Sequence, residues 1–235
     1  MKTSKFKLLV FLSVLGFSSF AQNLDEIIAK HIEAIGGKQN WEKLKAMRTE
    51  STMKAQGADI KFISVSVDKK ATRQDIFVMG MNGYNIINNS EGWNFAPWQG
   101  QTKPEAMTAD DVKNAQTDLY IQDEFITYKE LGKSIDYFGM DDIDGTECHK
   151  IKMTDKNGKE TTFYIDPATY YVIKRTSKTE ANGQVNENSI FFSDYKKTDF
   201  GLVIPMSSSG GWSETGITKV EINPVIDESI FKVSK

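Results

Sequence analysis

The side chains best suited to catalysis or metal binding are few in this sequence. It contains two histidines, His31 and His149, and a single cysteine, Cys148. Because a structural zinc site usually needs four cysteine or histidine ligands, these three residues do not complete one. His31 has no second ligand one helical turn away, which favours a packed, hydrogen-bonded histidine over a metal ligand. The sequence therefore predicts no metal site, no cofactor and no intrachain disulfide.

Two acidic clusters are the next candidates. Asp141, Asp142 and Asp144 form the denser one, and Asp110 and Asp111 form the other. Paired carboxylates can act in acid–base catalysis or bind a cation. Aspartate is also favoured in turns and at helix starts for local backbone reasons, and we adopt this interpretation. An exported hydrolase or metal-dependent enzyme stays open as an alternative that rests on these clusters alone.

The run Ser207–Gly211 joins hydroxyl groups to glycines, as nucleophile elbows and phosphate loops do. It lacks the strand-to-helix context that either motif requires, so we expect a polar strand end and a turn there. No nucleophile stands beside a base, and no glycine-rich nucleotide fingerprint occurs. The sequence predicts a protein that is not an enzyme.

The first 21 residues have the pattern of a secretory signal peptide. Three lysines precede an apolar run from Leu8 to Phe20, and small residues at Ser19 and Ala21 suit a signal peptidase. The run is shorter than the ~20 residues of a comfortable membrane span. Position 22 is glutamine rather than the cysteine of a lipid anchor. We expect a mature chain of residues 22–235, soluble in the periplasm.

Charge argues against polyanionic partners. Loss of the leader, which carries three lysines and no acidic residue, changes the formal net charge from −3 to −6. Nucleic-acid binders gain much of their affinity from basic patches, so we expect no nucleic-acid partner. The remaining length suits one domain with a substantial core, and we expect a monomer.

The mature chain should begin with a helix. Apolar residues recur at helical spacing from Leu24 to Ile35, and Gly36-Gly37 has the form of a C-cap. A second short helix is expected over Gln39–Met47. From Arg48 onward the apolar period changes to two, which indicates strands.

Short alternating segments linked by tight turns predict one large antiparallel sheet rather than βαβ units. In the central stretch from Gly145 to Arg175, apolar and polar side chains alternate, as in a sheet wetted on one face. A helical insert from Thr108 to about Leu131 separates two groups of strands and begins with a Thr-x-x-Asp capping box. We interpret the insert as a lid or plug. The expected strands are Arg48–Ala55, Ile60–Asp68, Ala71–Met79, Tyr84–Asn89, Gly92–Ala96, Ile135–Gly139, Cys148–Thr154, Glu160–Asp166, Tyr170–Glu180, Val185–Thr198, Gly201–Ser209 and Trp212–Asn223.

Apolar and aromatic side chains are distributed along this sheet and its insert. Each taken singly is normally a core residue. A curved sheet covered by helices either fills its inner face or leaves an apolar cavity of the kind that small hydrophobic ligands use. The sequence leaves both outcomes open. The candidate cavity and lid residues are Ile63, Val65, Phe77, Trp93, Phe95, Trp98, Met107, Leu119, Phe125, Phe163 and Phe192.

The order of features resembles a known family. The helix ends in Glu33-Ala34-Ile35-Gly36-Gly37, and the first group of strands ends in Gly92-Trp93-Asn94-Phe95-Ala96-Pro97-Trp98. After the insert come Asp144–Ile151 (DGTECHKI), Tyr164–Thr169 (YIDPAT) and Gly201–Pro205 (GLVIP). The chain ends with Ile226–Phe231 (IDESIF). With the leader, this order resembles the outer membrane lipoprotein-sorting (LolA-like) proteins of Bacteroidetes-type bacteria, over nearly the whole mature chain.

The resemblance implies an α+β, mainly β fold. Its single antiparallel curved sheet is an unclosed β-barrel of about eleven strands, with an N-terminal helix and a helical lid. The family's cavity binds acyl chains of lipoproteins or other lipids, and an arginine on the sheet of well-known carriers contacts lid carbonyls. Arg48 and Arg73 are candidates for that arginine.

Two hypotheses follow. The first is a periplasmic carrier or chaperone that shields an acyl chain or another lipophilic ligand between sheet and lid. Its partners would be the lipid or lipoprotein and membrane-associated donor and acceptor proteins. The alternative is a periplasmic sensor or protein-interaction module whose sheet is filled.

Overall fold

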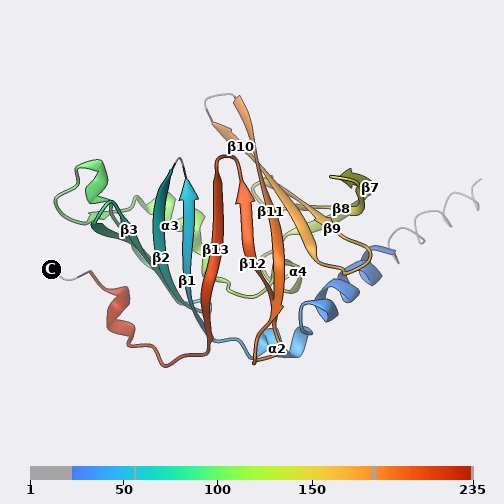
Figure 1. The fold of residues 1–235 in the computed structure, drawn as a ribbon, viewed down its shortest axis with the longest axis horizontal. Coiled ribbons are helices and arrows are strands. Elements are labelled where there is room, and N and C mark those ends of the chain that lie inside the picture. Colours follow the sequence, from blue (N-terminus) through green and yellow to red (C-terminus); the bar gives the residue numbers. More distant parts are fainter. Residues whose placement is uncertain (1–22, 56, 182–183, 234–235) are drawn as a thin grey trace, which may run out of the picture.

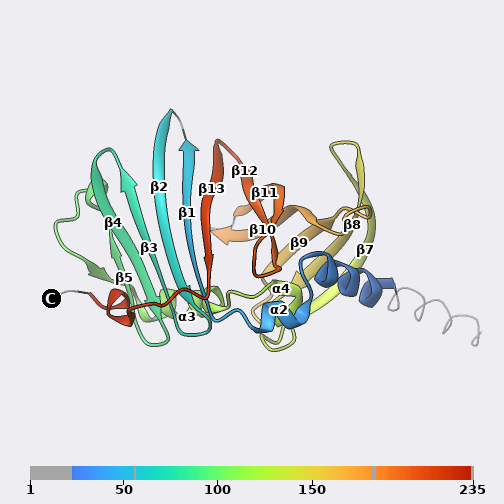
Figure 2. The ribbon, with the colours of Figure 1, turned by 60° about the horizontal axis from the view of Figure 1, so that its bottom comes forward.

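A computed structural model describes residues 23–55, 57–181 and 184–233, and its centre is one antiparallel sheet. The sheet curves strongly without closing (Figures 1 and 2). Within the described residues its thirteen strands follow the order β6-β5-β4-β3-β2-β1-β13-β12-β11-β10-β9-β8-β7. The count of about eleven implied by the family resemblance was therefore too low, partly because β6 has only two residues. The predicted signal peptide lies outside the described residues.

The strands connect mostly as hairpins, so chain neighbours are usually sheet neighbours. The exception joins β1 to β13, which places the first and last strands of the chain side by side in the middle of the sheet. The strand bounds are β1 Ala46–Ala55, β2 Ala58–Val67, β3 Ala71–Val78, β4 Met81–Asn88, β5 Gly92–Phe95, β6 Glu105–Ala106, β7 Ser134–Ile143, β8 Thr146–Thr154, β9 Glu160–Ile165, β10 Val172–Ala181, β11 Gln184–Lys197, β12 Val203–Gly210 and β13 Ser213–Ile222.

The helices are short, apart from the N-terminal helix over residues 23–34. The second helix ends earlier than expected, because β1 begins at Ala46 and pairs there with Val67 of β2. The predicted Thr108 cap is confirmed: the Asp111 N–H donates to its hydroxyl over 3.1 Å. Beyond α3 the insert breaks into shorter turns rather than continuing as helix. The other bounds are α2 Lys38–Glu42, η1 Pro97–Gln99, α3 Ala109–Asn114, η2 Ala115–Leu119, α4 Glu124–Thr127 and η3 Glu228–Phe231.

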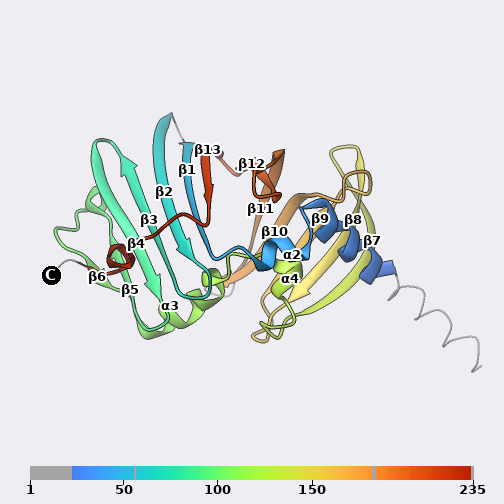
Figure 3. The ribbon, with the colours of Figure 1, turned by 90° about the horizontal axis from the view of Figure 1, so that it is seen from below.

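The sheet has two differently covered faces. We call the segment of residues 97–133 the insert, and the face that it covers the inner face. Residues directly opposite each other on paired strands share a face, so the register assigns every strand residue to one side. The N-terminal helix, α2 and the insert lie on the inner face, whereas the C-terminal turn η3 lies against the outer face (Figure 3).

The N-terminal helix ends where Gly36 and Gly37 both have positive φ, at 111° and 81°. The predicted glycine C-cap is confirmed. A Cβ at position 36 would lie 2.3 Å from the Gly201 carbonyl oxygen. Glycine therefore allows the helix end to pack directly on the turn before β12.

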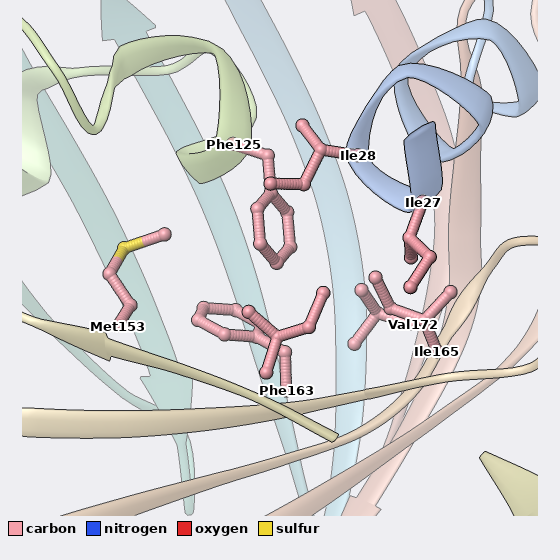
Figure 4. Packing of buried hydrophobic residues seen from close by; sticks show 8 residues of the cluster. Ile27, Ile28, Phe125, Met153, Phe163, Ile165 and Val172 are labelled. Atoms are coloured by element: carbon pink, nitrogen blue, oxygen red, sulfur yellow. The ribbon is translucent and has the colours of Figure 1, made fainter. Parts of the chain in front are cut away.

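Two buried clusters fill part of the inner face. The first packs Ile27 and Ile28 of the N-terminal helix and Phe125 of α4 onto Phe163 and Ile165 of β9 (Figure 4). The second joins Trp41 and Leu44 to Leu202 and Ile204, with Ile121 and Ile126 of the insert packed against it. A third cluster lies on the outer face, where Phe231 covers Val65 and Ile86.

A bulge at the start of β10 changes the alternation read from the sequence. Val172 pairs with Ile165 and Lys174 with Tyr164, so Ile173 is the extra residue. Regular alternation along the expected strand Tyr170–Glu180 predicts that Tyr171 and Ile173, two residues apart, lie on one side of the sheet. In the structure Tyr171 packs with the Trp41 cluster and Ile173 with the outer cluster around Cys148, so that prediction was wrong.

Candidate functional site

The register divides the eleven candidate cavity residues between the two faces. The alternation predicted for β2 is confirmed, because Ile63 and Val65 lie opposite Asp75 and Arg73 on one face. That face is the outer one. On the inner side are Trp98, Met107, Leu119, Phe125, Phe163 and Phe192. On the outer side are Ile63, Val65, Phe77, Trp93 and Phe95.

An apolar zone occupies the inner face of β1–β3 and β13. It lies toward the turns that join β1 to β2 and β3 to β4. Phe62 lies directly opposite Ile76 of β3, and on its other side Ser51 connects it to Ile217 of β13. All members are half-buried, and none belongs to the buried clusters found in the described part of the chain. We define the apolar zone as Met53, Ile60, Phe62, Ile76, Val78 and Ile217.

Trp98 borders this zone. Gly83 lies opposite Ile76, and a Cβ at position 83 would come within 2.6 Å of the Trp98 ring. Glycine is therefore what allows the indole to lie against the sheet next to the apolar zone.

A band of uncharged polar residues bounds the apolar zone on the side away from the β1–β2 and β3–β4 turns. Thr49, Ser64, Gln74, Asn85 and Asn94 lie opposite one another across five adjacent strands. Gln74 donates to Ser64 over 3.2 Å, and Asn94 donates to Asn85. An apolar molecule on the zone would meet amide and hydroxyl groups at this line. Alternation alone did not identify the band, because it becomes continuous only when the strands are set in register.

The other half of the inner face holds a mainly apolar pocket of about 220 Å³. It lies between the N-terminal helix, α2 and α4, over strands β9 to β12. Trp41, Phe163 and Phe192 contribute apolar walls, and Glu124 and Arg175 lie at one side. Two of the predicted candidates, Phe163 and Phe192, thus meet at one pocket.

A larger polar cavity of about 500 Å³ adjoins this pocket. Gln122, Glu124 and Arg175 line both spaces. Asp118 lies in the polar cavity, and burial raises the pKa of its carboxyl group. An amphipathic molecule would find an apolar compartment and a polar one on either side of the same three residues.

Glu124 connects the insert to the sheet. Its carboxylate lies 3.3 Å from Nη1 of Arg175 on β10 and 3.0 Å from Nζ of Lys133 at the end of the insert. Arg175 reaches the inner face because it pairs with Phe163. An ion pair between α4 and the sheet is a contact that must break if the insert moves away.

Arg48 and Arg73, the two arginines considered for a sheet-to-lid contact, have other partners. Arg48 contacts Glu50 at 2.9 Å and Glu221 at 2.8 Å on the outer face. Arg73 contacts Asp75 at 2.7 Å and donates to the Ile230 carbonyl oxygen at 2.9 Å. Arg73 therefore holds the C-terminal turn rather than the insert. Identifying Arg175 required the β9–β10 register, which the sequence does not display.

His31 is the second connection between the insert and the rest of the inner face. It is 2% exposed, and its Nδ1 lies 2.7 Å from the Tyr170 carbonyl oxygen. A carbonyl oxygen only accepts, so Nδ1 must carry a proton. Nε2 then faces Oδ2 of Asp123 at 3.5 Å and has no hydrogen-bond partner among the described residues. The Asp123 carboxylate also accepts the Phe125 N–H at the start of α4.

Protonation of His31 satisfies this geometry. Neutral imidazole with its proton on Nδ1 would direct a lone pair at a carboxylate, whereas imidazolium directs an N–H. Burial lowers the pKa of His31, but the Asp123 carboxylate and the Tyr170 carbonyl together outweigh it, so the pKa lies above its ordinary value. The predicted packed, hydrogen-bonded histidine is thus confirmed, with a charge partner in the insert.

The other residues considered for catalysis or metal binding have structural roles or lack reactivity. Asp141 pairs with Lys150 at 2.8 Å, and Asp142 accepts the Gly145 N–H at a turn. Burial raises the pKa of the Cys148 thiol to about 11, which disfavours the nucleophilic thiolate. Within the described ranges, no three His, Cys, Asp or Glu residues are placed to hold a metal ion. None of the helices described there is long and apolar enough to cross a membrane.

Comparison with known proteins connects this arrangement to solved structures. No family model matches the sequence, and no curated protein matches it. The structure is similar to that of a LolA superfamily protein from Nitrosomonas europaea, with a TM-score of 0.57 at 9% identity, covering 88% of this chain and 96% of that one. The chain has a LolA-like fold. The fold expected from the sequence motifs is therefore confirmed.

Two further structures share the LolA-like fold. One is a DUF1329 family protein from Desulfovibrio piger, with a TM-score of 0.55 at 12% identity, covering 88% of this chain and 96% of that one. The other is a domain from Vibrio parahaemolyticus named for outer membrane lipoprotein sorting. Its TM-score is 0.54 at 11% identity, and the match covers 88% of this chain and 94% of that one. Identities this low establish the fold, while the Bacteroidetes-type assignment stays a prediction.

Proposed function

We propose that the protein is a non-enzymatic periplasmic carrier that holds an acyl chain or another lipophilic group on the inner face of its sheet. The observation that carries the proposal is the apolar zone. Its six half-buried side chains face the side of the insert, in a fold shared with a protein domain named for lipoprotein sorting. Burying a chain there contributes ~0.8 kcal/mol per CH₂ group, so a partly sheltered chain gives useful affinity.

The polar features of the inner face support an amphipathic cargo. The polar band that runs across the sheet from Thr49 to Asn94 borders the apolar zone with neutral hydrogen-bonding groups. The 500 Å³ cavity is lined mainly by polar side chains. A lipid with an acyl portion and a polar portion suits both features. We infer that the mature chain, residues 22–235, acts as one monomeric domain that receives and delivers such a cargo.

The insert is proposed to control exchange, with the Arg175–Glu124 ion pair as one of its closing contacts. Arg175→Met is expected to speed release of a bound fluorescent fatty acid about 1.4- to fivefold, because an ion pair with partners this exposed contributes ~0.2–1 kcal/mol. Stopped-flow displacement measures the rate. Lys174→Met is the matched control, since Lys174 lies next in sequence on the outer face. Equal release rates in the two variants would show that the Arg175–Glu124 ion pair does not hold the insert closed.

Titration with a fluorescent fatty-acid probe tests the function itself. Saturable binding at one site per chain, reversed by unlabelled fatty acid, is expected of the mature protein. A protein that leaves the probe free at micromolar concentration is no carrier of acyl chains. The alternative is a protein-interaction module whose sheet is filled. It is supported by β9, whose inner face is already covered by the N-terminal helix and α4. It predicts a co-purifying polypeptide instead of a lipid.

A further inference from the structure

Two of the most exposed large apolar side chains lie at the tips of hairpins. Trp212 is 88% exposed and Met79 is 82% exposed. Trp212 belongs to the two-residue loop between β12 and β13, where Gly210 pairs with Ser213. Met79 belongs to the corresponding loop between β3 and β4.

Both tips project from the same side of the sheet. We call this side, which is formed by the turns at the ends of the strands, the edge. β3 and β12 run in the same direction, because one antiparallel strand separates each of them from β1. Their C-terminal ends therefore meet one edge, and Figure 2 shows the two hairpin ends on the side away from α2. With four strand spacings between them, the tips are about 20 Å apart.

The local backbone makes Met79 an unusual choice. It has φ of +52°, a conformation in which glycine, asparagine and aspartate are the ordinary residues of a hairpin turn. Trp212 follows Gly211, whose φ is +56°. Both loops thus present a large apolar side chain to solvent at positions where small polar residues are typical.

The two tips are uncharged, and the strands between them carry exposed Lys54, Asp59 and Glu214 near the same edge. Residues 76–84 and 200–213 contain no charged side chain. Val78, the residue before Met79, is itself a member of the zone, and Ile217 lies on the strand that follows Trp212. An apolar path therefore runs from the Met79 tip to the inner face, whereas Ser213 and Thr215 lie between the Trp212 tip and Ile217.

We propose that this edge docks onto a lipid bilayer, with Trp212 and Met79 entering the interfacial region. Tryptophan favours the boundary between headgroups and acyl chains, and two isolated tips need no complementary surface to insert. A protein partner is disfavoured by area, because a tryptophan side chain buries about 150–250 Å² whereas a stable interface needs about 800 Å² per partner. The proposal extends the carrier function by naming the surface through which cargo is exchanged.

Co-sedimentation of the mature protein with phosphatidylcholine vesicles tests the docking edge. The wild type is expected to bind, and the double variant Met79→Ser/Trp212→Ser is expected to bind at least tenfold more weakly. Phe138→Ser is the control, because Phe138 is an exposed aromatic residue of the terminal strand β7, 54% exposed. Lipids brominated along the acyl chain should quench wild-type fluorescence more than that of Trp212→Ser.

Binding of the double variant equal to that of the wild type would overturn the proposal. Binding by the wild type only when anionic lipid is added would do the same, because the two proposed tips carry no charge and the attraction would then come from other residues. The fatty-acid probe is titrated in parallel. A double variant that loses vesicle binding but still binds the probe supports both proposals. A wild type that binds vesicles but not the probe supports the docking edge and rejects the carrier function.

Discussion

Replacement of His31 by alanine is expected to destabilise the protein by about 3 kcal/mol at low pH and to remove part of its pH dependence. The substitution deletes a side chain that is 2% exposed and leaves Asp123 facing an emptied site. Because Asp123 remains partly solvated, the loss should fall at the lower end of the range for a broken buried pair. Urea denaturation at several pH values measures both effects.

The sign of the pH effect follows from the raised pKa of His31. The folded state holds this proton more tightly than the unfolded state, so the stabilisation is fully present below the ordinary pKa of ~6.5. It is lost as the pH rises through the higher folded value. Wild-type stability should therefore fall over this interval, and His31→Ala should be flatter.

His149 provides the matched control for this titration. Burial, with a smaller effect from Lys30, lowers its pKa, so its contribution to stability has the opposite sign and rises with pH. His149→Ala should preserve the fall in stability that His31 causes. If His31→Ala kept the wild-type pH profile, the ion pair with Asp123 would be refuted.

Phe62→Asp is expected to weaken binding of the fatty-acid probe about 30- to 160-fold. The substitution removes an aromatic side chain from the apolar zone and places a carboxylate against the acyl chain, at a combined cost of about 2–3 kcal/mol. Because Phe62 is only half-buried, we expect the variant to fold. Probe titration gives the affinity, and thermal unfolding verifies the fold.

Phe77→Asp is the control for Phe62→Asp. Both phenylalanines are half-buried on adjacent strands, but Phe77 lies opposite Lys61 on the outer face. Its replacement should change probe affinity less than about twofold, since its side chain points away from the proposed cargo. Equal losses in the two variants would show that the inner face does not hold the probe.

Much of the architecture was predictable from local sequence patterns. Alternation identified the strands, Gly36-Gly37 identified the helix end, and Thr108 identified the start of α3, because each depends on nearby residues. The early end of α2 at Glu42 was missed, because pairing of β1 with β2 and β13 overrides local helix preference.

The candidate site was harder to predict because it depends on register and on distant contacts. Alternation grouped Ile63 with Val65 correctly but gave no sign that η3 would cover their face. Phe62 and Ile76 were passed over, although both face the side of the insert. The Glu124–Arg175 and His31–Asp123 contacts join residues 51 and 92 positions apart, and no local motif marks them.

Native mass spectrometry of the protein, isolated from its own cells without detergent, tests the central claim most directly. Spectra are recorded before and after mild delipidation. The carrier function predicts a discrete added mass that disappears on delipidation, with a value that identifies the class of lipid. The mass of the bare polypeptide in both spectra, together with no uptake of added fatty acid, would contradict the proposal that the inner face holds an acyl chain.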